Sequence, residues 1–178
     1  MDDSAHLNRL GYREPRHSSS AESTDQCPNP PTDLMGLAEH LQSRLHSTGL
    51  RQITGITGAP GTGKSTFARQ RVDAFGREQG VIVPMDGFHL ANEIAFVITE
   101  GNYLLSAEPC WYGIRPLVDE IWFLDTAREL RVARLIARHI AFGMTREAAT
   151  AWATGPDEAN ARHIESTRHL ADREIRGA

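Results

Sequence analysis

The chain has 178 residues, of which 40% are hydrophobic and 24% charged, with a formal net charge of −4. These values predict a single folded domain and exclude a multidomain assembly. No run approaches the roughly 18 apolar residues of a membrane span, and the acidic start is unlike a signal peptide. We therefore expect a cytoplasmic protein with no membrane partner. The mildly acidic balance argues against nucleic-acid binding, which relies on clustered basic residues.

Residues 1–33 are rich in Ser, Pro, Asp, Glu and Asn. This composition buries too little apolar surface to offset the entropy lost on ordering, so we predict a disordered N-terminal tail. An extension without a function is the simpler interpretation of it. Residues 34–178 then form the folded domain. The two cysteines, Cys27 and Cys110, are too few for a disulfide framework, and we expect both to remain reduced.

Hydrophobic periodicity in the rest of the chain predicts alternating helices and strands. Leucines at helical spacing indicate an amphipathic helix that ends at Gly49, and a strand, helix, strand unit follows it. Two further runs are apolar throughout, as in parallel strands covered on both faces. The fold class is therefore α/β. The predicted strands cover residues 53–57, 81–83, 95–99 and 121–124, and the helices after Gly49 cover 64–75, about 127–142, 145–153 and 157–171.

A phosphate-binding motif lies between the first strand and the helix that follows it. The run Gly58-Ala59-Pro60-Gly61-Thr62-Gly63-Lys64-Ser65 matches G-x-x-x-x-G-K-[ST] in the strand, loop, helix context that the motif requires. Its glycines let the backbone approach phosphates, Lys64 neutralises the β- and γ-phosphates, and Ser65 holds Mg²⁺. We predict that this phosphate loop, together with Thr66, binds ATP. A chance Gly-rich turn is the alternative.

Lysine usage supports this prediction. Of the 19 basic residues only Lys64 is a lysine, and all the others are arginines. A compact point charge on a flexible stem suits the phosphate position, so a single lysine retained there favours a functional role.

Two carboxylates follow predicted strands. Asp86 lies after the second strand, where ligands collect in open α/β sheets, and it could take a proton from a substrate hydroxyl or hold a water of Mg²⁺. A turn aspartate before glycine is the alternative. Glu100 ends the third strand, and we predict that it is the acid on the metal side, next to Ser65. A strand-end glutamate that faces water is the alternative.

Four arginines share one face of the predicted helix over residues 127–142. They recur at three- and four-residue steps. Such a face is usually solvated, but in phosphoryl transfer an arginine helix can close over the triphosphate and stabilise the charge on the leaving oxygens. Both interpretations stay open at this stage. The four residues are Arg128, Arg131, Arg134 and Arg138.

Together the chemistry-bearing segments resemble the superfamily of uridine kinase, phosphoribulokinase and bacterial pantothenate kinase. Besides the phosphate loop, the similar runs are Met85-Asp86-Gly87-Phe88-His89, Thr99 to Leu105 and Arg134 to His139. The resemblance covers about residues 34–172 and is strongest to the nucleoside/nucleotide kinase branch, sometimes labelled fructose transport system kinase. It implies a P-loop three-layer sandwich with a mostly parallel sheet, ATP and Mg²⁺. It also implies Asp86 as the catalytic base and Arg138 as the lid arginine, with Arg134 one turn earlier.

The chain departs from the family pattern in two places. In the lid, Arg138-His139 and Phe142-Gly143 stand where Arg-Asp and a further Arg-Gly are common, so the second lid arginine is absent. Between the predicted second and third strands only about Leu90 to Ile94 remain, whereas a parallel crossover needs a dozen or more residues. Several dozen residues enclose the acceptor there in the family. We therefore expect the chain to lack most of the acceptor site.

The sequence predicts an ATP-dependent kinase that phosphorylates a hydroxyl of a small molecule, such as a nucleoside, a sugar or a pantothenate-like compound. The alternative is a nucleotide-binding protein whose acceptor site is degenerate, and the short crossover favours it. A GTPase is disfavoured because the guanine-reading motif Asn-Lys-x-Asp needs a second lysine. The acceptor and the oligomeric state, a homodimer included, are left open.

Overall fold

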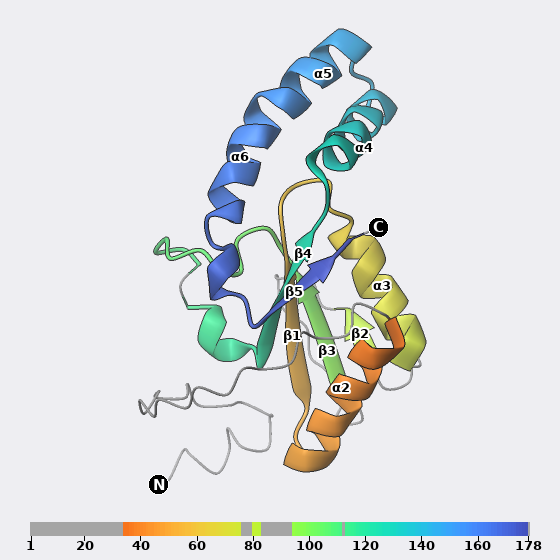
Figure 1. Cartoon of the computed structure of the whole chain (residues 1–178), viewed down its shortest axis with the longest axis vertical. Coiled ribbons are helices and arrows are strands. Elements are labelled where there is room, and N and C mark those ends of the chain that lie inside the picture. Colours follow the sequence, from red (N-terminus) through yellow and green to blue (C-terminus); the bar gives the residue numbers. More distant parts are fainter. Residues whose placement is uncertain (1–33, 76–79, 83–93, 112, 178) are drawn as a thin grey trace, which may run out of the picture.

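The computed structural model describes residues 34–75, 80–82, 94–111 and 113–177 (Figure 1). The predicted tail and Cys27 lie outside these residues, and so does the proposed base Asp86. Cys110 is a free, exposed thiol. Across the described part of the chain, no helix is long and apolar enough to cross a membrane.

A five-stranded sheet lies at the centre, in the order β2-β3-β1-β4-β5, and all four pairings are parallel. The four predicted strands are confirmed with small shifts of their ends. The fifth was not predicted, because it has four residues of which one, Ile175, is buried. The strands are β1 Gln52–Thr57, β2 Gly80–Ile82, β3 Phe96–Glu100, β4 Glu120–Asp125 and β5 Arg173–Arg176.

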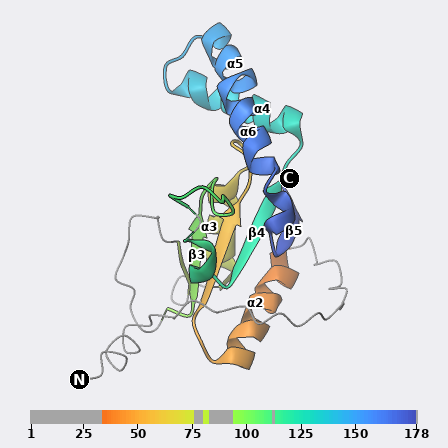
Figure 2. The same ribbon diagram turned by 90° about the vertical axis from the view of Figure 1, so that its left-hand side faces the viewer.

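The helices form two groups. Helices α2 (Leu34–Thr48) and α3 (Lys64–Phe75) lie beside the sheet. Helices α4 (Arg128–Ala141), α5 (Arg146–Thr154) and α6 (Pro156–Glu165) project beyond the carboxyl ends of the strands (Figure 2). The connection from β4 into α4 therefore carries the predicted lid helix directly over the phosphate loop.

The last predicted helix is shorter than its apolar pattern indicates. The prediction of a helix over 157–171 is wrong at its end, because α6 stops at Glu165. The hydroxyls of Ser166 and Thr167 donate to the carbonyls of His163 and Ile164, a local competition that ends helices. Short 3-10 helices cover Arg168–Leu170 here and Arg115–Leu117 before β4.

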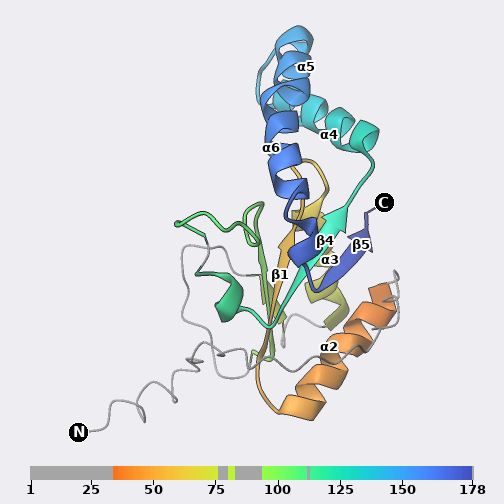
Figure 3. The ribbon, with the colours of Figure 1, turned by 60° about the vertical axis from the view of Figure 1, so that its left-hand side comes forward.

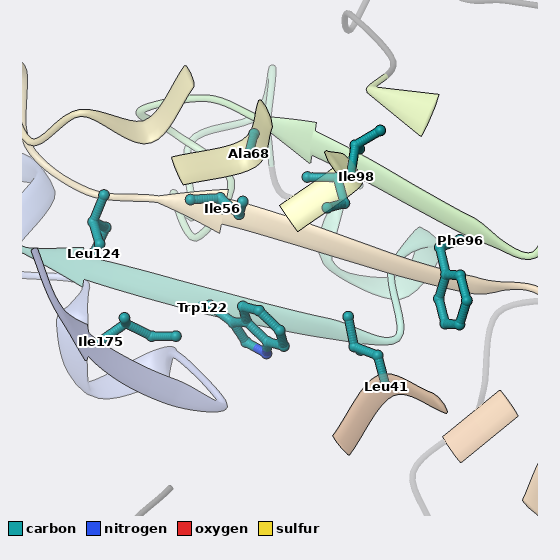
Figure 4. Close-up of a cluster of buried hydrophobic side chains, with 9 residues drawn as sticks. Leu41, Ile56, Ala68, Phe96, Ile98, Trp122, Leu124 and Ile175 are labelled. Carbon is teal, nitrogen blue, oxygen red and sulfur yellow. The ribbon is translucent and has the colours of Figure 1, made fainter. Parts of the chain in front are cut away.

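Strand β4 supplies both hydrophobic cores, since successive side chains of a strand point to opposite faces. Trp122 and Leu124 pack with Leu41 of α2 and Ala68 of α3 in the first core (Figure 4). On the other face, a second core contains Ile121, Phe123, Leu104, Leu105 and Ile164. That face is covered by the segment after β3 and the end of α6. Each large side chain buried in this way contributes about 1.5–3 kcal/mol.

The connection between β2 and β3 falls mostly on residues that the structure does not describe. The two strands are parallel neighbours, with Ile82 opposite Ile98. The described part of β2 reaches Ile82, and β3 begins at Phe96. The expectation of a crossover too short for a parallel connection therefore stays a prediction. Residues 83–93 lie outside the described part of the chain.

The opposite edge of the sheet is organised around Glu120, at the start of β4. Its side chain is 7% exposed and accepts hydrogen bonds from His40 (2.9 Å) and Arg44 (2.9 Å) of α2. Trp122 Nε1 (2.8 Å) and Arg173 Nε of β5 (3.3 Å) donate to its second oxygen. Burial alone would raise the pKa of Glu120, but the hydrogen bonds from Trp122 and His40 and the nearby charges hold it below its usual value.

We expect Glu120→Gln to lower the free energy of unfolding by about 1–3 kcal/mol at neutral pH, since the bonded cations lose their anion. A carboxyl whose folded pKa is lowered stabilises the fold above its ordinary pKa of 4.5 and loses that contribution as the pH falls further. The difference between the variant and the wild type should therefore shrink in acid. Urea denaturation at pH 7 and pH 3.5 measures it, with the exposed Glu39→Gln as control. A difference that is independent of pH would contradict the assignment.

Candidate active site

Backbone geometry defines the phosphate loop, which connects β1 to α3. Gly58 has φ 148° and Gly61 has φ 82°, values that residues with side chains rarely adopt. A Cβ at Gly58 would lie 2.4 Å from the carbonyl oxygen of Leu124, and one at Gly61 would lie 2.7 Å from that of Arg131. The loop therefore packs directly against the backbone of β4 and α4. Only glycine fits at both contacts.

Lys64 begins α3 and is 8% exposed. Its Nζ donates to the carbonyls of Gly58 (2.9 Å) and Ala59 (3.1 Å), so the ammonium is curled into the phosphate loop. The pKa of Lys64 is lowered to about 8: burial lowers it most, the charge of Glu100 acts in the opposite direction, and the charges of Arg138 and Arg131 also lower it. The ammonium is thus held by carbonyl contacts that phosphate oxygens can replace.

Ser65 and Glu100, the two predicted metal ligands, form a hydrogen bond with each other. The Ser65 hydroxyl donates to Glu100 Oε1 at 2.6 Å, although the two residues are 35 positions apart. The pairing of β1 with β3 places Glu100 opposite Ile56, close to the start of the loop. Within the described ranges no group of three His, Cys, Asp or Glu side chains could hold a metal alone. A hydroxyl and a carboxylate fit Mg²⁺ nonetheless, because Mg²⁺ in phosphoryl-transfer sites takes few protein ligands and completes its shell with phosphates and water.

A cavity of about 340 Å³ lies over the phosphate loop. Three cationic side chains and one carboxylate line it, so its charge is suited to a polyanion. Asn102, two residues after Glu100, also lines it and was not predicted as a site residue, because an isolated asparagine after a strand carries no motif. The charged lining residues are Lys64, Glu100, Arg134 and Arg138.

The four arginines of α4, the predicted lid helix, separate into two pairs. Arg128 Nε donates to Glu158 of α6 at 2.8 Å, and Arg131 is 2% exposed. Arg134 lines the cavity and its Nη1 lies 3.4 Å from the carbonyl oxygen of Thr62, while Arg138 is exposed at the cavity. Neither interpretation of a common face, solvated or phosphate-covering, holds for all four. Helical spacing identified the shared side but not what packs against it.

Helix α6 links α4 to the segment that follows β3. It runs back from the tip of the helical projection toward the sheet (Figure 3). Asp157 of α6 pairs with His139 of α4 at 2.7 Å. His139 stands where aspartate is common in the resembled superfamily, so in this chain the carboxylate comes from another helix. At the other side, the hydroxyl of Tyr103 donates to Asn160 at 2.9 Å, and Tyr103 follows Asn102 directly.

A second cavity, of about 390 Å³, adjoins the first. The two share Gly63, Thr66 and Arg134, and the second adds the apolar side chains of Phe67 and Leu124. A charged compartment that opens into a more apolar one matches the two halves of a nucleotide, the phosphates and the base.

Comparison with known proteins agrees with this geometry. A protein described as a fructose transport system kinase, from Silicibacter sp., superposes with a TM-score of 0.67 and 28% sequence identity over 80% of this chain and 98% of its own. The chain has the fold of the P-loop kinases. The Saccharomyces cerevisiae protein YFH7, described as a P-loop containing kinase with a circular permutation, shows the same fold at 14% identity and a TM-score of 0.68, with 81% and 98% of the chains covered.

One curated sequence shares part of this P-loop kinase-like chain. An ATP-dependent kinase-like protein of Aspergillus versicolor is 43% identical over 56 residues, which are 31% of this chain. The match spans 32% of that relative, about a third of its length. No protein-family model matches the chain. These likenesses support a kinase-type, nucleotide-binding protein and leave its substrate undetermined.

The single lysine of this P-loop kinase-like protein permits a direct test of the site. With ¹³Cε-labelled lysine, the one lysine resonance should titrate near pH 8, because burial lowers the pKa of Lys64 to about 8 from 10.5. Glu100→Gln should move the midpoint lower still, since the Glu100 charge raises this pKa. The matched control is Glu108→Gln, an exposed carboxylate on the same segment after β3. A midpoint near the ordinary value would contradict the buried ammonium.

Proposed function

We propose that the protein is an ATP-dependent kinase that transfers the γ-phosphate of ATP to a hydroxyl of a small molecule. The observation that carries the proposal is the convergence of Lys64, the Ser65 and Glu100 pair, and Arg138 on one cavity. These groups come from α3, β3 and α4, and each has a role in phosphoryl transfer. The kinase-type fold neighbours support the same reaction class.

In this proposal the phosphate loop binds and orients the triphosphate. Lys64 exchanges its bonds to the Gly58 and Ala59 carbonyls for the β- and γ-phosphate oxygens. The peptide N–H groups at the start of α3 and the positive end of its dipole face the same oxygens. Ser65 and Glu100 would hold Mg²⁺, which would neutralise negative charge on the transferring phosphates. The base and ribose would occupy the adjoining cavity beside Phe67.

Transfer needs charge stabilisation and an activated acceptor. Arg138 is exposed in the cavity, and its side chain makes no hydrogen bond or ion pair with another described residue, so its guanidinium is available to the γ-phosphate. Arg134, shared by both cavities, would contact the nucleotide. We assign the acceptor base to Asp86 on the resemblance to the kinase superfamily. In the sequence Asp86 follows β2, the parallel neighbour of the strand that Glu100 ends.

Lys64→Ala should abolish MgATP binding or weaken it by about 3 kcal/mol, more than a hundredfold in Kd, because a charge-assisted contact to the phosphates is lost. Isothermal titration with ATP and ADP measures the effect, and circular dichroism checks the fold. Arg69→Ala is the matched control, an exposed cation on the same helix outside both cavities. Equal affinity of Lys64→Ala and the wild type would refute the phosphate-site assignment.

A coupled ADP-release assay with nucleosides, hexoses and pantothenate tests the transfer step itself. Acceptor-dependent turnover that Arg138→Met and Asp86→Asn abolish supports the kinase. MgATP binding without turnover on any acceptor would favour the second candidate, a nucleotide-binding protein with a degenerate acceptor site. The observation in favour of that candidate is the length of the β2 to β3 connection, since residues 83–95 must supply both the crossover and an acceptor wall.

Glu100→Gln should separate metal binding from phosphate binding. The variant keeps Lys64 and the loop, so ATP binding in EDTA should be unchanged or tighter because a negative charge leaves the cavity. The increase in ATP affinity on adding Mg²⁺ should be largely lost. Titrations with and without Mg²⁺ measure both quantities, with Glu108→Gln as control. An undiminished Mg²⁺ effect would show that Glu100 does not face the metal.

A further inference from the structure

Arg131 is the most deeply buried charge next to the phosphate loop. It lies on α4 one turn before Arg134, and its side chain is 2% exposed. Its Nη2 lies 3.1 Å from Glu165 Oε1 and 3.7 Å from Glu158 Oε2, both on α6. It does not line either of the two cavities at the loop, so it is not a ligand for phosphates.

Contacts with the phosphate loop run in both directions. Arg131 Nη1 lies 3.4 Å from the carbonyl oxygen of Pro60. The carbonyl oxygen of Arg131 occupies the space beside Gly61, 2.7 Å from where a Cβ would stand. Leu135, one turn later, lies 3.0 Å from the same position. Side chain and main chain of α4 therefore interlock with two successive residues of the loop.

Stability alone does not account for a charge at this place. Burying an ion pair costs desolvation energy that its attraction repays poorly, and apolar replacements of similar size are often neutral or stabilising. The guanidinium adds a fixed geometry. Its planar set of N–H groups faces carboxylates of α6 and a carbonyl oxygen of the loop at the same time. Arg128 offers the contrast, since its side chain also pairs with Glu158 but is 54% exposed and makes no hydrogen bond with a described residue of the loop.

We propose that Arg131 is a positioning residue that fixes the phosphate loop against α4, so that Arg134 and Arg138 face the same cavity as Lys64. Both arginines follow Arg131 on one rigid helix, so the orientation of α4 relative to the loop decides where their side chains lie. The inference deepens the proposed function and rests on it in treating this cavity as the phosphate site.

The first test needs no nucleotide. In the full chain, Arg131→Met should lower the NMR order parameters of the loop amides, those of residues 58, 59 and 61–63, from about 0.85 toward 0.6, the range of a flexible backbone. Arg131→Lys should restore them in part, and the matched Arg128→Met should leave them unchanged. If Arg131→Met fails to fold, Glu165→Gln replaces it with the same expectation. A loop as rigid in the Arg131 or Glu165 variant as in Arg128→Met would overturn the proposal.

The second test is a double-mutant cycle on MgATP affinity by isothermal titration. Arg138→Met should weaken binding about tenfold in the wild type and in Arg128→Met, but less than about threefold in Arg131→Met, where Arg138 is already displaced. If Arg131 contributed to stability alone, Arg138→Met would weaken MgATP binding by the same factor in the wild type and in Arg131→Met. That result would overturn the proposal. If the wild-type chain binds no MgATP, the proposed function fails, and the loop order parameters still decide the role of Arg131.

Discussion

The close approach of the phosphate loop to the backbones of β4 and α4 is the contact on which the site depends. Two carbonyl oxygens, those of Leu124 and Arg131, occupy the space that side chains at Gly58 and Gly61 would need. This packing holds the loop in the curve that buries Lys64. It also brings the first turns of α4 over the loop, so that Arg134, Arg138 and Lys64 line one cavity.

Two of the cations of the cavity have partners within the protein itself. Three cations gather at the cavity around one carboxylate, and two of them, Arg134 and Lys64, turn toward carbonyl oxygens of the loop. A carbonyl oxygen attracts a cation less strongly than a phosphate oxygen does. These contacts therefore hold the side chains of Lys64 and Arg134 in place while weakening phosphate binding little. The ligand would replace these contacts one by one, and the cavity would need little rearrangement.

Local patterns in the sequence predicted the α/β fold and the likeness to P-loop kinases, because the phosphate loop is a short continuous motif between a strand and a helix. Glu100 was expected near the metal because it ends a predicted strand beside the loop, and in the structure it accepts a hydrogen bond from Ser65. Long-range packing could not be predicted in this way. Helical spacing placed Arg131 on a common face with Arg138, but the carboxylates of α6 that bury it lie some 30 residues further along the chain. Strand β5 was missed for a related reason, since a four-residue strand carries almost no periodicity.

The cluster around Glu120 bears on the order in which the chain folds. It joins His40 of α2, the first described helix, to Arg173 of β5, the last described strand. During synthesis, β4 and its glutamate emerge long before residue 173, so for that interval the carboxylate lacks one of its cations and the edge of β4 lacks its neighbour. Contacts of such wide sequence separation form late and slow folding. Closure of the sheet by β5 is therefore a natural final step of folding, completed only after the helices over the phosphate loop have been made.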